Sequence, residues 1–239
     1  MAPRREKQRS ESTSTPDGIL GRRRITTRSR TARAKERSSP YFRVPESEWE
    51  RVTRELIARH PLRPAEIVEV VLGSWEAIFQ STLGDGFRVG QHIFPKPQIM
   101  GFLLHELIPL EFEHLKPKEW RAEQTAADKD LVYLPDDSFS IEIKTSSHPA
   151  QIYANRSYGQ EGVSEGKKAK SGYYIAVNFD RWPSISKKPT KKLVKPSIRS
   201  VRFGWLDHTD WLAQSAATGQ QSALPALVEN AQLLTFFQV

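Results

Sequence analysis

The sequence predicts a mixed α/β (α+β) fold, a mixed sheet flanked by helices, and three kinds of stretch support that prediction. Residues 64–80 and 97–108 repeat apolar side chains at helical spacing. Residues 139–144 alternate strictly between apolar and polar side chains, as a half-buried strand does. Residues 173–179 are almost continuously apolar, aromatic or β-branched, which is typical of a strand buried on both faces.

The helical stretches have recognisable starts. Ser47 and Glu50 have the spacing of a capping box, which predicts a helix from there to about Arg59. Pro64 and Pro97 each suit the first turn of a further helix.

The helix from Pro97 is apolar on nearly every side, so we expect it to be buried. A carboxylate on a buried helix needs a partner or a metal ion, which makes Glu106 and its neighbour His105 candidates for a functional site. The alternative is that Glu106 faces solvent or pairs with a nearby Lys or Arg.

The net charge of +8 lies entirely in residues 1–40, which hold twelve basic and four acidic residues. This Arg- and Ser-rich arm has almost no large apolar side chains, so we expect it to be disordered and residues 41–239 to form a single folded domain. The arm suits contact with a DNA backbone or minor groove, or it is a tail without a partner.

Several classes of protein are excluded or disfavoured. The chain has no cysteine, which removes disulfides and thiolate chemistry and favours a reducing, cytoplasmic location. No apolar run reaches about 18 residues, so we expect no membrane span, and the basic N-terminus lacks the hydrophobic core of a secretory signal. The six histidines lack zinc-hydrolase spacing, and no P-loop, dinucleotide fingerprint or serine-hydrolase elbow is present.

Residues 127–147 predict a β-hairpin that carries acidic residues and a lysine. The apolar run 131–134 forms one strand, and side chains two residues apart on the next strand share a face, so Glu142 and Lys144 lie together. Carboxylates beside an ammonium group suit metal-assisted phosphodiester hydrolysis, because hard oxygen ligands hold Mg²⁺ and a lysine can lie by the attacking water or the phosphate. The alternative is a solvated strand face with an ion pair worth at most about 1 kcal/mol.

The register of this hairpin decides whether Asp130 joins Glu142 and Lys144. A regular four-residue turn at 135–138 would set Asp130 opposite Ile143, on the wrong face. An odd loop, a bulge or a bend would set Asp130 across from Glu142 or Lys144. The hydrolytic mechanism requires one of these irregular forms.

The other elements follow in a definite order. They are a short strand at 120–125, a polar and aromatic helix from Pro149 to about residue 160, a strand at 197–206, a helix capped by Asp207 and a closing segment at 224–237.

This order resembles the PD-(D/E)xK nuclease superfamily, whose core is an α-β-β-β-α-β unit. More narrowly, five stretches within about residues 98–180 resemble ScaI-type type II restriction endonucleases: HELIPL, KDLVY, FSIEIKTSSH, NRSYGQ and KSGYYIAVNF. The resemblance implies a restriction-endonuclease-like core and Mg²⁺-dependent, site-specific cleavage of double-stranded DNA in a restriction–modification system.

The resemblance also implies a role for each matching residue. Asp130 and Glu142 would be metal ligands, and the Ile143 carbonyl would add a backbone oxygen. Lys144 would orient the attacking water, lower its pKa or stabilise charge in the transition state. Glu106 would be the helix carboxylate that some members use. Lys129 stands where the superfamily's name has proline, and Asp128 competes with Asp130 for the same role.

DNA contacts are expected after the hairpin, at Asn155, Arg156, Ser157, Tyr158 and Gln160. Asn and Gln can recognise adenine, and Arg can recognise guanine, in the major groove. This stretch could equally be a capping and turn motif that buttresses the active site. Lys167, Lys168, Lys170 and the lysines of 187–195 suit phosphate contacts, or they line solvated loops.

Cutting both strands of a palindrome normally takes two active sites related by a two-fold axis, so we expect a homodimer. The helix at 65–80 and the segment 227–239 are candidate dimer surfaces, although core packing accounts for each as well. Two other functions remain open: a repair or recombination nuclease without strict sequence specificity, and a non-catalytic DNA-binding protein that uses the basic arm.

Overall fold

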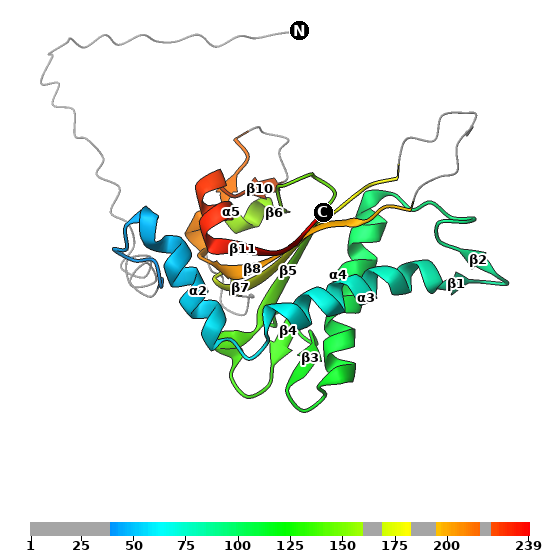
Figure 1. The fold of residues 1–239 in the computed structure, drawn as a ribbon, viewed down its shortest axis with the longest axis horizontal. Coiled ribbons are helices and arrows are strands. Elements are labelled where there is room, and N and C mark those ends of the chain that lie inside the picture. The colour runs from blue at the N-terminus through cyan, green and yellow to red at the C-terminus, as the bar shows by residue number, and fades with distance from the viewer. Residues whose placement is uncertain (1–38, 160–168, 183–194, 216–220) are drawn as a thin grey trace, which may run out of the picture. The chain divides into compact units, whose positions relative to one another are not determined.

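The computed structural model describes residues 39–159, 169–182, 195–215 and 221–239 (Figure 1). These residues belong to one compact unit, Ser39–Val239. The arm expected at 1–40 lies outside the described part except for its last two residues, as do Gln160, Lys167 and Lys168. Among the described residues, every helix is too short or too polar to cross a bilayer.

A six-stranded mixed sheet forms the centre of this unit, as predicted. Its strands lie in the order β11–β8–β7–β5–β4–β3. Strands β5 and β7 run parallel, and the other neighbouring pairs are antiparallel. The bounds are β3 (Trp120–Ala122), β4 (Leu131–Tyr133), β5 (Ile141–Ser146), β7 (Gly172–Phe179), β8 (Ile198–Leu206) and β11 (Leu233–Gln238).

Helices and a second, small sheet cover the central sheet. The helices are α2 (Trp49–Arg59), α3 (Pro64–Gln80), α4 (Pro97–Leu115) and α5 (Ala226–Gln232). The small sheet has the order β6–β10–β9, with β6 (Tyr153–Asn155), β10 (Gln221–Ala223) and β9 (Leu212–Ala213). Short elements complete the unit: the hairpin β1 (Thr82–Leu83) and β2 (Phe87–Arg88), and the 3₁₀ turns η1 (Glu46–Glu48), η2 (Asp137–Phe139), η3 (Arg156–Gly159) and η4 (His208–Asp210).

Alternate side chains of β7 enter two hydrophobic clusters on opposite faces of the sheet. Ile175 and Val177 belong to a large cluster with residues of α3 and α4. Tyr174 and Ala176 belong to a smaller cluster with residues of β6 and α5. Figure 1 shows α5, β6 and β10 gathered away from α3 and α4. All of β7 is buried, which confirms the strand predicted at 173–179.

The helices predicted from Pro64 and Pro97 are confirmed at those residues. The capping box predicted at Ser47 is wrong, because the Glu48 N–H donates to the Pro45 carbonyl (2.9 Å) and the turn η1 takes up this stretch. Helix α2 therefore begins one residue later than a cap at Ser47 would have placed it, without a side-chain cap. Asp207 caps only the turn η4 in place of a helix.

The expectation that the helix from Pro97 is buried on nearly every side is wrong. Its inner side contacts β5, where the Thr145 hydroxyl donates to the Gly101 carbonyl at 3.2 Å. A Cβ on Gly101 would lie 2.8 Å from that hydroxyl, so this close approach favours glycine. On the outer side, Ile99 and Phe102 are 52% and 59% exposed. A helix on the outside of a sheet has only one side to pack.

The helix predicted from Pro149 to about residue 160 is also wrong. The chain there forms β6 and η3, so the described part of the crossover between β5 and β7 contains no α-helix. Strand β6 pairs with β10, which comes much later in the chain. Because strand preference depends strongly on the partner strand, local sequence did not reveal this pairing.

A buried set of side chains, here called the Arg202 network, holds the loop that leads from β5 to β6. Arg202 Nη2 donates to the Ala150 carbonyl (2.8 Å), to Asn178 Oδ1 (2.9 Å) and to Glu229 Oε1 (3.0 Å). Glu229 Oε1 also accepts from the Ile152 N–H (3.0 Å). The Asn178 amide donates to two further carbonyls of this loop. Strands β7 and β8 and helix α5 thereby fix the path that the chain takes after β5.

Candidate active site

The hairpin register brings Asp130 and Glu142 together. Leu131 pairs with Ile141, and the same antiparallel register continued by one residue sets Asp130 opposite Glu142. The connection includes η2 and spans residues 132–140 between the paired residues, an odd number, in place of a regular four-residue turn. The irregular register that the mechanism requires is therefore present.

Asp130 lies between strand β5 and helix α4. It is 3% exposed, and its Oδ2 accepts a hydrogen bond from the Ile143 N–H at 2.6 Å. The same oxygen lies 3.1 Å from Nε2 of His105, which comes from α4. These contacts place the carboxylate against β5 and under α4.

Glu142 is 2% exposed and lies in contact with two hydrogen-bond donors. The Lys144 ammonium group donates to Glu142 Oε1 and lies 3.4 Å from the Ile143 carbonyl oxygen. The Tyr158 hydroxyl, from η3, donates to the same Glu142 oxygen at 2.5 Å. We call Asp130, Glu142 and Lys144, together with His105 and Tyr158, the carboxylate cluster.

The residue of α4 that reaches this cluster is His105, and Glu106 points outward. The Glu106 side chain is 50% exposed, and its carboxylate lies 3.4 Å from Nδ1 of His105. Burial by itself would lower the pKa of His105, but the hydrogen bond and charge of Asp130 outweigh it, so the pKa is raised. The sequence placed His105 directly beside the candidate Glu106 in the HELIPL stretch, and this adjacency was the signal that could have identified His105 as the residue that reaches Asp130.

Asp128 and Asp130, which competed for one role, have different surroundings. Asp128 Oδ2 accepts from Arg121 (2.9 Å) and from the N–H groups of Gln124 and Thr125 (3.0 Å each). The Arg121 guanidinium, followed by these N–H groups, holds the pKa of Asp128 well below its usual range. Asp128 therefore closes its own loop, whereas Asp130 joins the cluster.

The donor set fits a small hard cation. Among the described residues, no group of three or more His, Asp or Glu side chains is placed to hold a metal ion. Mg²⁺ is commonly held in proteins by one or two carboxylates, with water and substrate phosphate completing its coordination. Asp130, Glu142 and the Ile143 carbonyl match that requirement, and the two carboxylates outnumber the one ammonium group of Lys144.

The residues expected to contact DNA differ from one another in exposure and in surroundings. Asn155 and Ser157 are exposed, Arg156 is half-buried, and Tyr158 belongs to the carboxylate cluster. Lys170 is half-buried, donates to the Ser157 carbonyl and lies over the Tyr158 ring, 5.6 Å from its centroid. Of the lysines expected to contact phosphate, Lys170 is thus the one that the described part of the chain places beside the cluster.

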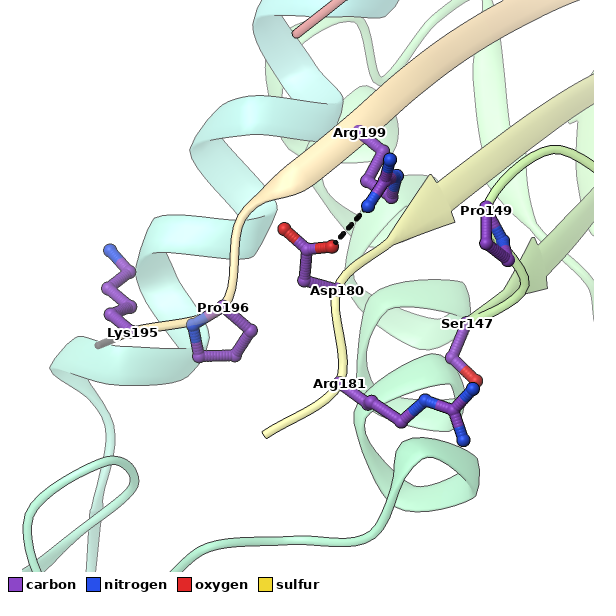
Figure 2. A pocket seen from close by; sticks show the side chains of 7 residues that line it. All are labelled: Ser147, Pro149, Asp180, Arg181, Lys195, Pro196 and Arg199. Atoms are coloured by element: carbon purple, nitrogen blue, oxygen red, sulfur yellow. Dashed lines mark hydrogen bonds and ion pairs between the residues drawn. The ribbon is translucent and has the colours of Figure 1, made fainter. Parts of the chain in front are cut away.

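A basic pocket lies beyond the carboxyl ends of β5 and β7 (Figure 2). It encloses about 300 Å³ and is lined by Ser147, Pro149, Asp180, Arg181, Lys195, Pro196 and Arg199. Arg199 pairs with Asp180 at 2.9 Å, as the dashed line in Figure 2 shows. None of the carboxylate-cluster residues lines this pocket, whose cationic side chains outnumber its acidic one.

The class that this fold defines is the restriction-endonuclease-like proteins, with a mixed sheet flanked by helices. The model of the ScaI restriction endonuclease family matches residues 39–237. The type II restriction enzyme ScaI of Streptomyces caespitosus is 54% identical over 202 residues, which are 84% of this chain and 86% of that enzyme. The chain belongs to the ScaI restriction endonuclease family. No solved structure matches it significantly.

Membership of this family confirms the function expected from the sequence. The chain is a DNA-hydrolysing, site-specific restriction endonuclease, and double-stranded DNA is its substrate. The family favours this function over a non-specific repair nuclease or a non-catalytic DNA-binding protein.

Proposed function

We propose that the carboxylate cluster of this restriction endonuclease hydrolyses the phosphodiester with Mg²⁺. The observation that carries the proposal is the register that sets Asp130 opposite Glu142, with Lys144 on the same strand as Glu142. In this proposal Asp130, Glu142 and the Ile143 carbonyl hold the ion. Glu106, being exposed, acts through His105.

Each residue then has a distinct task. When bound, Mg²⁺ supplies a Lewis acid that polarises the phosphate and lowers the pKa of an attacking water. Lys144 is 14% exposed, so its ammonium group is held within the site, where it orients the water and offsets charge that develops on the phosphate. His105 and the Ile143 N–H fix Asp130 from two sides.

The protein surface around the cluster supplies DNA contacts in this proposal. Asn155, Arg156 and Ser157 face the base edges or the sugar–phosphate backbone, and Lys170 contacts a phosphate. Gln160, Lys167 and Lys168, which lie outside the described residues, belong to the same segment. A cytoplasmic location follows from a substrate that enters the cell as DNA.

Substitution of Glu142 or Lys144 by alanine tests the site. Purified variants are incubated with plasmid DNA and Mg²⁺, and DNA affinity is measured separately in EDTA. We expect each variant to lose at least about 100-fold in cleavage rate, as for loss of a group that acts on the transition state, while DNA affinity is largely kept.

Glu111→Ala and Lys118→Ala are matched controls, because both side chains are exposed and lie outside the cluster. The controls should cut like the wild type. Undiminished Mg²⁺-dependent cleavage by both Glu142→Ala and Lys144→Ala would move the active site elsewhere.

A homodimer completes the proposal, because two symmetric active sites cut the two strands of a palindrome. Helix α3 buries Ile67, Val71 and Ile78 in the core, so packing accounts for that candidate surface. The edge strand β11 leaves Phe236 39% exposed. Sedimentation of the free protein and its DNA complex tests the stoichiometry, and a single subunit on a cleaved palindrome would contradict it.

A further inference from the structure

Tyr158 lies where the two central groups of the carboxylate cluster meet. Its hydroxyl donates to Glu142 Oε1 (2.5 Å) and lies 3.5 Å from the Lys144 ammonium nitrogen. The same ammonium lies over the Tyr158 ring, 4.9 Å from the centroid, at a distance that suits a cation–π contact. One side chain therefore contacts both Glu142 and Lys144.

The position of Tyr158 is fixed from outside the cluster. Its ring packs against Trp211 (5.6 Å between centroids) and against the smaller hydrophobic cluster. The Ser222 hydroxyl accepts from the Gly159 N–H (3.1 Å) and donates to the Arg156 carbonyl (3.2 Å), which ties η3 to β10. Tyr158 is therefore presented by a rigid support.

Gly159 is required by this arrangement. A Cβ at this residue would lie 2.3 Å from the backbone nitrogen of Ala213, closer than any side chain could be accommodated without moving one of the two segments. The turn η3 thus packs directly on the backbone of β9, and the residue next to Tyr158 has no side chain for that reason.

The Tyr158 hydroxyl has a defined hydrogen-bond direction, because it donates to the Glu142 carboxylate. A phenol hydroxyl donates one hydrogen bond, and here its acceptor is Glu142 Oε1.

We propose that Tyr158 is a positioning residue that sets the Glu142 carboxylate and the Lys144 ammonium group for hydrolysis, and that it does not contact DNA. This inference rests on the proposed function of Glu142 and Lys144. The hydroxyl fixes the rotation of the carboxylate, and the ring limits where the lysine side chain can lie. Partners of this kind around a metal site typically contribute about 10–100-fold to affinity or activity.

Tyr158→Phe tests the hydroxyl, because phenylalanine keeps the ring and its packing on Trp211. We expect the single-turnover cleavage rate to fall about 10–100-fold, and the Mg²⁺ concentration for half-maximal rate to rise by a similar factor. Calorimetric titration of the free protein with Mg²⁺ should show the same weakening without DNA. DNA affinity in EDTA should remain within about two-fold, unlike the loss of roughly 5- to 150-fold expected when a base contact is removed.

Tyr153→Phe is the matched control. It removes a hydroxyl from the same segment, where Tyr153 donates to Gln151 (2.7 Å), away from the cluster. We expect this control to match the wild type in rate and in Mg²⁺ requirement. Ser222→Ala, which loosens η3 without altering Tyr158, should reproduce part of the Tyr158→Phe defect with the thermal midpoint of unfolding measured alongside.

Two results would overturn the inference. One is a Tyr158→Phe protein with the wild-type rate and Mg²⁺ requirement, and the other is a defect that appears only as weaker DNA binding in EDTA. Glu142→Ala in the same assay keeps the two proposals apart. If Glu142→Ala cuts normally the proposed function fails, whereas an inactive Glu142→Ala beside a normal Tyr158→Phe rejects the positioning role alone.

Discussion

The Arg202 network and the carboxylate cluster are two sets of buried charged side chains supported by the same sheet, and they differ in charge balance. In the Arg202 network one guanidinium faces one carboxylate, with Asn178 and loop backbone groups as neutral partners. The named members of the carboxylate cluster include two carboxylates and one ammonium group, that of Lys144, with His105 beside Asp130. Counted over these named side chains alone, the first set is neutral, and the second has more negative than positive charge when His105 is neutral.

This difference separates a structural set from one prepared for a ligand. A balanced pair with several hydrogen-bond partners fixes the backbone and leaves no net charge for a ligand to neutralise. Two carboxylates held side by side repel one another and a bound cation offsets that repulsion, so a functional site accepts a cost in stability that the Arg202 network avoids. Four measurements of the free energy of unfolding test this contrast.

The largest expected effect is at the Arg202 network. Arg202→Ala leaves Glu229 buried without its cation, which should destabilise the protein by about 3–5 kcal/mol in urea unfolding. The double variant Arg202→Met with Glu229→Leu should recover much of that loss, because the charged pair is then removed together. A loss below 1 kcal/mol in the single variant would contradict the structural role.

Asp210 provides a smaller, pH-dependent test of the cost of unbalanced charge. Burial, partly opposed by a hydrogen bond from the Asp207 N–H, raises the pKa of Asp210 to about 7. Because the pKa of Asp210 is higher in the folded than in the unfolded protein, ionising this carboxyl disfavours the folded state. The free energy of unfolding therefore falls as pH rises from about 4 to about 7. Asp210→Asn should therefore gain about 2 kcal/mol more at pH 8 than at pH 5. An equal gain in the free energy of unfolding at both pH values would contradict the raised pKa of Asp210.

Mg²⁺ should stabilise the protein through the carboxylate cluster and leave the Arg202 network unaffected. At tenfold its dissociation constant, the ion should raise the free energy of unfolding by about 1.4 kcal/mol. Asp130→Asn should abolish this gain, and Asp128→Asn, a matched substitution at the neighbouring loop residue, should keep it. The comparison fails if both variants respond like the wild type.

Glu142→Gln should show the smallest change in stability. Removing one of two buried carboxylates reduces the negative excess while glutamine keeps an acceptor for Tyr158, so the free energy of unfolding should change by less than about 1 kcal/mol or rise. Cleavage should nevertheless be lost. A strongly destabilised Glu142→Gln would place Glu142 with the structural set.

The hairpin and its register were within reach of the sequence because they depend on local rules. Alternation from Ile141 to Lys144 determines which side chains share a face, and the two-residue repeat of strand side chains is enough to show that Asp130 needs an odd register. The choice between Asp128 and Asp130 could not be made from the sequence, because no spacing rule reveals that Asp128 pairs with Arg121 and closes its own loop.

The parts that could not be predicted depend on distant segments. Strand β6 replaces a helix because β10 pairs with it and the Arg202 network holds the loop before it. His105, and not Glu106, reaches Asp130 because only one side of α4 packs on the sheet. Tyr158 was expected near DNA or as a buttress of the site, and its contact with Glu142 needs η3, which the sequence did not predict.

The support of η3 has a consequence for the order in which the protein is made. Asp130, Glu142 and Lys144 leave the ribosome well before Ser222 and Glu229, which hold η3 and the loop after β5. A growing or truncated chain that lacks these last residues contains the three charged groups without the frame that sets Tyr158. Synthesis must be nearly complete before the cluster can be assembled, so a prematurely ended chain would be poorly equipped to cut its host's DNA.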